Sequence, residues 1–189
     1  MYLKNRNYDQ MFKQMLQHIE QTTAFSIAMI DIDNFHSYLE GKSSDEVIQN
    51  LSQFLSDRLL DRIYYCGKDE FFVISPRKHS EELFFDLTMA NRELQNIMNL
   101  SFSASIVEFP KNGEELHLLI RLLEEAVYLA KEQGRNRVVF ANETKMKLKS
   151  NYYTLTQLKR LAELSRKLNR SEASILRESL DDMLRKHEN

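Results

Sequence analysis

The chain has 189 residues, of which 42% are hydrophobic and 29% are charged, and its formal net charge is −2. This length corresponds to one domain of ordinary size, or to one domain with a small addition, and no stretch approaches the roughly 20 apolar residues of a membrane span. The first ten residues lack the apolar core of a secretion signal, and the single cysteine, Cys66, excludes an internal disulfide, so we expect a cytoplasmic protein without a membrane partner.

Charge is distributed unevenly along the chain. Residues 1–140 carry 15 Lys and Arg against 21 Asp and Glu, a net charge of −6, whereas residues 141–189 carry 11 against 7, a net charge of +4. A basic end of this kind indicates a polyanionic partner, and a solvated helical tail has the same composition.

Helices and short strands alternate in the first part of the chain. The spacing of apolar residues predicts helices over 8–21, 43–60, 80–97 and 114–133. Runs rich in β-branched and aromatic residues predict strands over 25–31, 62–66, 70–75, 101–109 and 137–140. Ser43 and Glu46 have the spacing of a capping box, and Gly134 stands where a left-handed C-cap belongs. This order predicts an α+β fold, a mostly antiparallel sheet covered by helices.

Acidic residues follow two of the predicted strands. Gly67 and Lys68 suit the two-residue loop of a hairpin, and Asp69 and Glu70 come directly after it. If this hairpin lies beside the first strand, its acids meet Asp31 at one end of the sheet. Converging carboxylates repel one another and usually hold a hard cation such as Mg²⁺, whereas loop acids that stay apart and exposed have no such role.

Three motifs in this order, "AMIDIDNF", "GKDEFFVI" and "EEAVYLAKEQGRNRVVF", resemble the GGDEF domain of diguanylate cyclases over residues 3–140. The resemblance implies a palm-like, ferredoxin-like fold. In active members of that family, two GTP molecules, one on each subunit, condense to cyclic di-GMP with Mg²⁺.

The resemblance also implies roles for individual residues. Metal ligands would be Asp31, the Ile32 carbonyl and Asp69. Asp69 and Glu70 match the two signature acids, the first of which is linked to activation of the 3′-OH group. The terminal phosphates would be gripped by Lys131 and Arg135, which we expect to share a helix face because they are four apart near a helix end.

Several positions depart from the family pattern. Lys68 replaces a glycine that leaves room for the nucleotide, and Leu39 replaces the asparagine that reads the guanine edge. The loop "LEGKSSD" is shorter than in the family, and His36 replaces a lysine, whereas Asp45 is a candidate match for a second guanine-reading acid. Loss of a polar specificity group costs orders of magnitude in discrimination, so we predict impaired synthesis. The alternative is that Lys68 pairs with a phosphate.

Arg58 and Asp61 have the Arg-x-x-Asp spacing of the inhibitory site of the same family, directly before the hairpin. There the pair binds cyclic di-GMP, a task that suits the bidentate guanidinium group. Arg92 is a candidate second arginine for this site. The other interpretation is a weak surface ion pair.

A second domain is predicted after residue 141, giving domains of 1–141 and 142–189. The second resembles a ribbon-helix-helix DNA-binding domain, with a basic strand, a helix over 154–169 that opens with Thr154 and Gln157 at capping-box spacing, and a helix over 170–187. In that family two chains pair their strands and bind the major groove of double-stranded DNA. The candidate DNA contacts are Lys147, Lys149, Asn151, Arg170 and Ser171. A helical hairpin that only dimerises remains an alternative.

The leading hypothesis is therefore a homodimeric, DNA-binding transcription regulator that senses cyclic di-GMP or GTP. The alternatives are an active diguanylate cyclase that dimerises through its tail, and an adaptor whose sites are relics. Because the chain starts inside the usual leading segment of the family, we expect no upstream sensor domain.

Overall fold

The computed structural model describes residues 12–13, 17, 24–141, 150–168 and 171–187. The chain divides into two compact units, Met1–Lys145 and Met146–Asn189, and each is considered by itself. The predicted helix over 8–21 and the predicted domain boundary after residue 141 fall largely on residues outside the described ranges.

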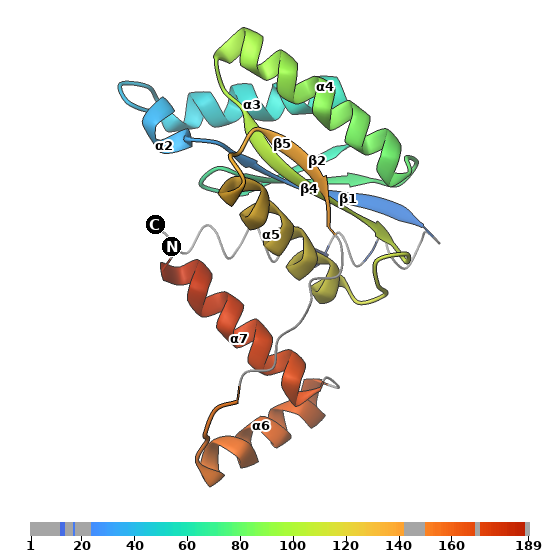
Figure 1. Cartoon of the computed structure of the whole chain (residues 1–189), viewed down its shortest axis with the longest axis vertical. Coiled ribbons are helices and arrows are strands. Elements are labelled where there is room, and N and C mark those ends of the chain that lie inside the picture. The colour runs from blue at the N-terminus through green and yellow to red at the C-terminus, as the bar shows by residue number, and fades with distance from the viewer. Residues whose placement is uncertain (1–11, 14–16, 18–23, 142–149, 169–170, 188–189) are drawn as a thin grey trace. The chain divides into compact units, whose positions relative to one another are not determined.

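A five-stranded sheet forms the centre of the first unit (Figure 1). Its order is β2-β3-β1-β4-β5. Three neighbouring pairs are antiparallel, and β4 and β5 are parallel, so the sheet is mixed. This agrees with the predicted α+β class. The strands are β1 (Phe25–Ile32), β2 (Arg62–Gly67), β3 (Glu70–Ser75), β4 (Phe102–Phe109) and β5 (Arg137–Phe140).

Helices cover both faces of this sheet. On one face lie α3 (Ser44–Leu59) and α4 (Ser80–Met98), and on the other lies α5 (Leu116–Glu132) (Figure 1). A single-turn helix, α2 (Phe35–Tyr38), follows β1. None of the helices described is long and apolar enough to cross a membrane.

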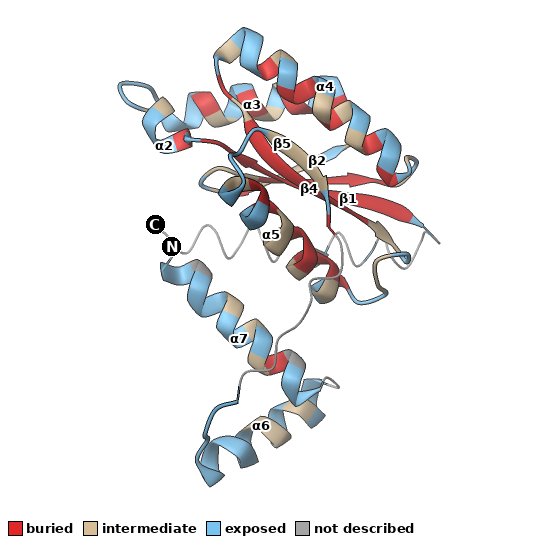
Figure 2. Cartoon of the chain, viewed as in Figure 1, coloured by how far each residue is buried: buried red, intermediate tan, exposed pale blue. Residues whose placement is uncertain are grey.

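β1 is buried along its whole length because both of its faces meet helices (Figure 2). Its side chains alternate between the faces, as the two-residue period of a strand requires. Ala28 and Ile30 join the core under α3 and α4, and Ile27 and Met29 join the core under α5. This central position places the end of β1, where the candidate site lies, inside the first unit.

The hairpin between β2 and β3 differs by one residue from its prediction. Gly67 is the last residue of β2 and pairs with Glu70, so the two-residue turn is Lys68-Asp69 instead of Gly67-Lys68. The register shifts between Tyr65 and Gly67, and this bulge takes up the extra residue. As a result Lys68, with φ of 53°, takes the left-handed conformation that favours glycine.

The predicted C-cap of α5 agrees with the structure, whereas the predicted capping box of α3 does not. Gly134, with φ of 111°, follows α5, and the N–H groups of Gly134 and Arg135 donate to the carbonyls of Lys131 and Ala130, which is a Schellman motif. Ser43 is the N-cap residue of α3, but its side chain makes no capping hydrogen bond, so the capping-box prediction is wrong there.

The second unit contains α6 (Leu155–Leu168) and α7 (Glu172–His187). At the start of α6 the predicted capping box is present, since Gln157 Oε1 accepts from the Thr154 N–H at 2.9 Å and the Gln157 N–H donates to Thr154 Oγ1 at 3.2 Å. α6 has no buried residue (Figure 2). Both helices also carry exposed apolar side chains. These exposed side chains are Leu155, Leu158, Leu164, Leu168, Leu180, Met183 and Leu184. The basic strand predicted before α6 lies mainly outside the described residues.

Candidate functional site

Three carboxylates gather at one end of the central sheet. Asp31, near the end of β1, is opposite Glu70 of β3, and Asp69 lies in the turn just before Glu70. One carboxylate oxygen of each lies within 4.8 Å of the others. The backbone N–H of Ile32 donates to the carbonyl of Asp69 at 3.0 Å, which ties the turn to β1. The structure thus brings together the three acids that we expected to meet, and we name them the carboxylate cluster.

Asp31 is the buried member of the carboxylate cluster, with 7% of its surface exposed. Burial, followed by the charge of Asp69, raises the pKa of its carboxyl from 3.8 to about 7, although a hydrogen bond from Lys131 acts in the opposite direction. Burial disfavours the charged form of the Asp31 carboxyl, and a nearby cation stabilises that charged form.

The donor set of the carboxylate cluster fits Mg²⁺, which prefers carboxylate oxygens. Asp31, Asp69 and Glu70 would hold the ion, which is the set that the strand order predicts, whereas the family resemblance counts only Asp31, the Ile32 carbonyl and Asp69 as ligands. When bound, such an ion neutralises phosphate charge. The predicted role of the Ile32 carbonyl stays a prediction.

Lys131 and Arg135 do not share a helix face. Lys131 lies in the last turn of α5, and its Nζ donates to Oδ1 of Asp31 at 2.8 Å. Arg135 lies beyond the end of the helix, is exposed and has φ of 61°. The argument from a spacing of four on a helix is therefore wrong, because the helix ends at Glu132 before it reaches the arginine.

Asp33 has a structural role that the sequence did not reveal. It is 2% exposed and accepts three hydrogen bonds, from Ser103 Oγ at 2.8 Å, Ser101 Oγ at 2.7 Å and the Asn136 N–H at 2.9 Å. These bonds join the end of β1 to the start of β4 and to the residue before β5. They hold in place the end of β1, and with it the backbone of Asp31 in the carboxylate cluster.

Two residues that depart from the family pattern lie in different surroundings. Leu39 is partly buried and packs against the core under α3 and α4. Lys68 is exposed at the tip of the hairpin, and its carbonyl accepts from the Tyr65 hydroxyl at 3.2 Å. Burial, followed by the charge of Asp69, raises the pKa of Tyr65.

The Arg-x-x-Asp residues point to different partners. Arg58, in the last turn of α3, donates to Oε1 of Glu93 on α4, and its side chain is 46% exposed. The Asp61 side chain is only 6% exposed and accepts from Ser75 Oγ at 2.9 Å and from Lys78 Nζ at 2.8 Å. Arg92, on α4, is exposed. Nothing in the sequence signalled that Lys78 would hold Asp61.

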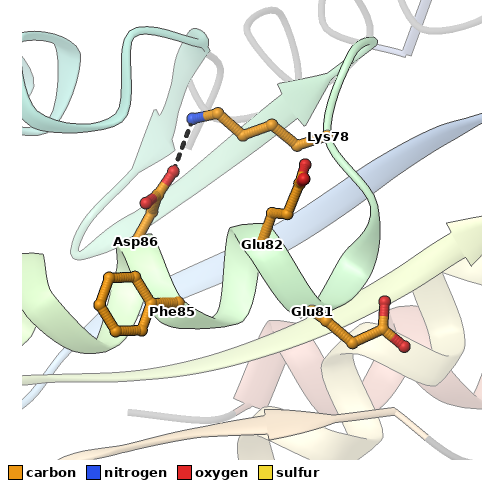
Figure 3. Close-up of a pocket in the computed structure, with 5 residues that line it drawn as sticks. All are labelled: Lys78, Glu81, Glu82, Phe85 and Asp86. Atoms are coloured by element: carbon orange, nitrogen blue, oxygen red, sulfur yellow. Dashed lines mark ion pairs between the residues drawn. The ribbon is translucent and has the colours of Figure 1, made fainter.

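A pocket of about 530 Å³ adjoins this region (Figure 3). Its lining includes Lys78 and Asp86, which point toward one another and form an ion pair of 2.7 Å. The other lining residues are Glu81, Glu82 and Phe85. Three of the five lining side chains are acids, so the pocket does not suit a phosphate group, and it includes no member of the carboxylate cluster.

The candidate DNA contacts are only partly within the described residues. Lys147, Lys149 and Arg170 lie outside them. Asn151 is exposed, and its Oδ1 accepts from the Tyr152 N–H at 2.8 Å. Ser171 stands at the N-cap position of α7, because its carbonyl accepts from the Ile175 N–H at 3.2 Å.

Known proteins share both the sequence pattern and the fold of the first unit. Diguanylate cyclase DosC of Escherichia coli (strain K12) is 28% identical over 150 residues, which are 72% of this chain and 33% of that protein. Diguanylate cyclase DgcM of the same strain is 30% identical over 138 residues, 67% of this chain and 33% of that protein. The chain thus spans about a third of the length of these relatives.

Among solved structures, the GGDEF domain of DgcB from Caulobacter crescentus in complex with c-di-GMP matches with a TM-score of 0.57 and 21% identity, over 70% of this chain and 86% of that one. The family model described as "Diguanylate cyclase, GGDEF domain" matches residues 2–137. Together with the carboxylate cluster at the end of β1, this match shows that the chain belongs to the GGDEF family of diguanylate cyclase domains.

Proposed function

We propose that this protein is a homodimeric, DNA-binding transcription regulator of the cytoplasm. In this proposal its GGDEF domain, 1–141, binds cyclic di-GMP and has lost efficient synthesis from GTP. Its second domain, 142–189, is of the ribbon-helix-helix kind. The observation that carries the proposal is the tail, in which a basic segment accompanies two helices that leave seven large apolar side chains exposed.

The exposed apolar side chains of α6 and α7 support the dimer. Leu155, Leu158 and Leu168 are 87%, 42% and 46% exposed, although they recur at helical spacing. A unit of 44 residues buries too little surface to be stable alone, and a second copy of the same stripe supplies the missing apolar partner.

The basic residues of the tail support the DNA-binding role. Paired strands would present Lys147, Lys149 and Asn151 to the major groove, and the N-terminus of α7, with Arg170 and Ser171, would receive a phosphate. Binding to double-stranded DNA should weaken steeply with salt, since each neutralised phosphate releases counterions.

The nucleotide part of the proposal rests on Arg58. Its guanidinium group is held by an exposed pair with Glu93, and exposed pairs of this kind are weak, so Arg58 is free to turn to a phosphate or guanine. Asp61 is held more firmly, by Ser75 and Lys78, so cyclic di-GMP must exchange these partners for a guanine edge. DgcB from Caulobacter crescentus, which shares the fold, has been solved in complex with c-di-GMP.

Impaired synthesis is supported by two residues. Leu39 has no polar group to read a guanine and packs on the core, and Lys68 adds a side chain to the turn next to Asp69.

The second candidate function, an active diguanylate cyclase, is favoured by the carboxylate cluster and by Lys131 beside it. Production of cyclic di-GMP from GTP and Mg²⁺, abolished by Asp69→Ala, would establish this alternative.

Calorimetry with cyclic di-GMP tests the nucleotide part directly. We expect binding by the whole chain, loss of binding in Arg58→Ala, and unchanged binding in Arg62→Ala, which removes another exposed arginine four residues away. The absence of heat with the unmodified chain would contradict the sensor role.

Retardation of double-stranded DNA over a range of salt concentrations tests the regulator role. The double variant Lys147→Ala/Lys149→Ala should lose binding and reduce the salt dependence, and Lys42→Ala/Lys111→Ala, which removes two exposed lysines of the first unit, should not. If neither the unmodified chain nor the control binds DNA at low salt, the tail is a dimerisation or adaptor module instead.

A further inference from the structure

An ion pair joins the end of α5 to the end of β1. Nζ of Lys131 lies 2.8 Å from Oδ1 of Asp31, although the two residues are 100 positions apart in the chain. The two side chains are 28% and 10% exposed, so the pair is largely screened from water. The lysine therefore supplies a cation to the buried member of the carboxylate cluster without any metal ion.

The position of this amine matters because Asp31 is shared between two possible cations. Its carboxylate lies within 4.8 Å of Asp69 and Glu70, and these three acids are the group that fits a divalent ion. A divalent ion at the cluster would lie close to the lysine, and like charges at short range in a poorly solvated site repel strongly. The Lys131 ammonium group and a divalent ion therefore cannot both bind Asp31 at full strength at the same time.

We infer that Lys131 acts as an internal competitor of the divalent cation at Asp31. In the resting protein the lysine satisfies the buried carboxylate, and the metal must displace it. A ligand that carries phosphate offers Lys131 an alternative anion, so its arrival releases Asp31 for the metal. Lys131 is then a positioning residue that makes occupancy of the cluster depend on a phosphate-bearing ligand.

The inference goes beyond the proposed function, because it requires neither DNA nor cyclic di-GMP. It differs from the phosphate-gripping role that the family resemblance gives to Lys131, since the contact described is with the metal ligand itself. Direct electrostatic competition predicts that removal of the lysine charge increases metal affinity, whereas a lysine that only grips phosphate leaves the affinity for metal alone unchanged.

Titration of the whole chain with Mn²⁺, in the absence of nucleotide, tests this directly by calorimetry. We expect Lys131→Met to bind Mn²⁺ about tenfold more tightly, or more, than the unmodified chain. Lys131→Arg, which keeps the charge, should bind as weakly as the unmodified chain. Lys111→Met, which removes an exposed lysine on the turn after β4, should leave the affinity unchanged.

Equal or weaker Mn²⁺ binding by Lys131→Met would overturn the inference, as would a lack of binding by both proteins. Circular dichroism checks that each variant is folded. If Lys131→Met does not fold, Lys131→Gln takes its place, because the amide keeps a hydrogen bond to Asp31 without the charge. The same increase in affinity is expected, and its absence is equally decisive.

Discussion

Lys78 and Asp61 form an ion pair in which Nζ lies 2.8 Å from Oδ2. The same ammonium group also donates to the carbonyl of Leu59 at 2.6 Å and contacts Oδ2 of Asp86 at 2.7 Å. An ammonium group has three N–H donors, so each has a partner. Burial lowers the pKa of Lys78, but the bonds to Asp61 and Asp86 outweigh it and raise the pKa. The lysine thereby connects the end of α3, the start of β2 and α4.

Lys78→Met should lower the free energy of unfolding by about 2–4 kcal/mol, because it leaves the carboxylate of Asp61 without its cation at 6% exposure. Urea denaturation measures the loss. Lys111→Met is the matched control, since that side chain is 64% exposed and its contacts are 3.8 and 3.9 Å long, and it should change stability by less than about 0.5 kcal/mol. Equal losses in the two variants would show that the Lys78 contacts add nothing.

Asp33→Ala should destabilise the first unit by about 3–5 kcal/mol, because two serine hydroxyls and the Asn136 N–H lose a charged acceptor inside the protein. Thermal or urea unfolding checks this. Asp57→Ala removes an exposed carboxylate from α3 and should cost less than about 0.5 kcal/mol. A small effect of Asp33→Ala would mean that water replaces the carboxylate readily.

The pH dependence of the free energy of unfolding should reflect the ionisation of Asp31. Its pKa is about 7 in the folded chain against an ordinary value of 3.8, so between these values the folded state binds more protons at this site than the unfolded state. Its contribution to stability is therefore full below pH 3.8 and is lost as the pH rises to about 7, with a slope of at most about 1.4 kcal/mol per pH unit.

Unfolding measured from pH 4 to 7 in Asp31→Asn should lack this slope, while Asp57→Asn should retain it. Direct titration of Asp31 by carbon-13 NMR should give a midpoint near the same value. A midpoint close to 4 would show that Lys131 outweighs burial and the neighbouring acids.

Lys68→Gly should make the hairpin more stable and the turn more open. Glycine adopts the left-handed conformation without the steric cost that a side chain brings. Because φ at this position is 53°, the substitution should raise the free energy of unfolding by about 1 kcal/mol. If the side chain impedes GTP, formation of cyclic di-GMP should rise about tenfold or more, as measured with GTP and Mg²⁺. Lys68→Asn, which tolerates the same backbone conformation but keeps a side chain, should gain stability without the gain in turnover. Equal turnover in both variants would exclude the steric explanation.

Leu158→Glu should dissociate the proposed dimer, because it places a charge in the apolar stripe of α6. Sedimentation velocity should show a monomer, and DNA retardation should be lost with it. Thr156→Glu adds the same charge at an exposed position off that stripe and should leave the dimer intact. A monomeric unmodified chain would rule out self-association through this stripe.

Much of the fold could be predicted because it depends on local periodicity. The apolar spacing of Leu51, Leu55 and Leu59 predicted α3, and all three are fully buried. The hairpin turn was placed one residue early, because a bulge at Tyr65–Gly67 leaves no mark in the pattern of apolar residues.

The candidate site was predictable only in part, for a related reason. The three acids come from segments whose pairing the strand order implies, so their convergence could be anticipated. The contacts of Lys131 with Asp31 and of Lys78 with Asp61 depend on side-chain reach across the tertiary fold, over 100 and 17 residues of sequence. A single lysine in a sequence gives no indication of which carboxylate it will meet.

The hydrogen bond from the Asn136 N–H to Asp33 couples the end of β1 to the start of β5. It fixes the residue before β5 to a side chain two positions after Asp31. β5, which is four residues long, is the final strand among the residues that the structure describes. A ligand that displaces the end of β1 should therefore also move the start of β5, because a single amide proton couples the two segments.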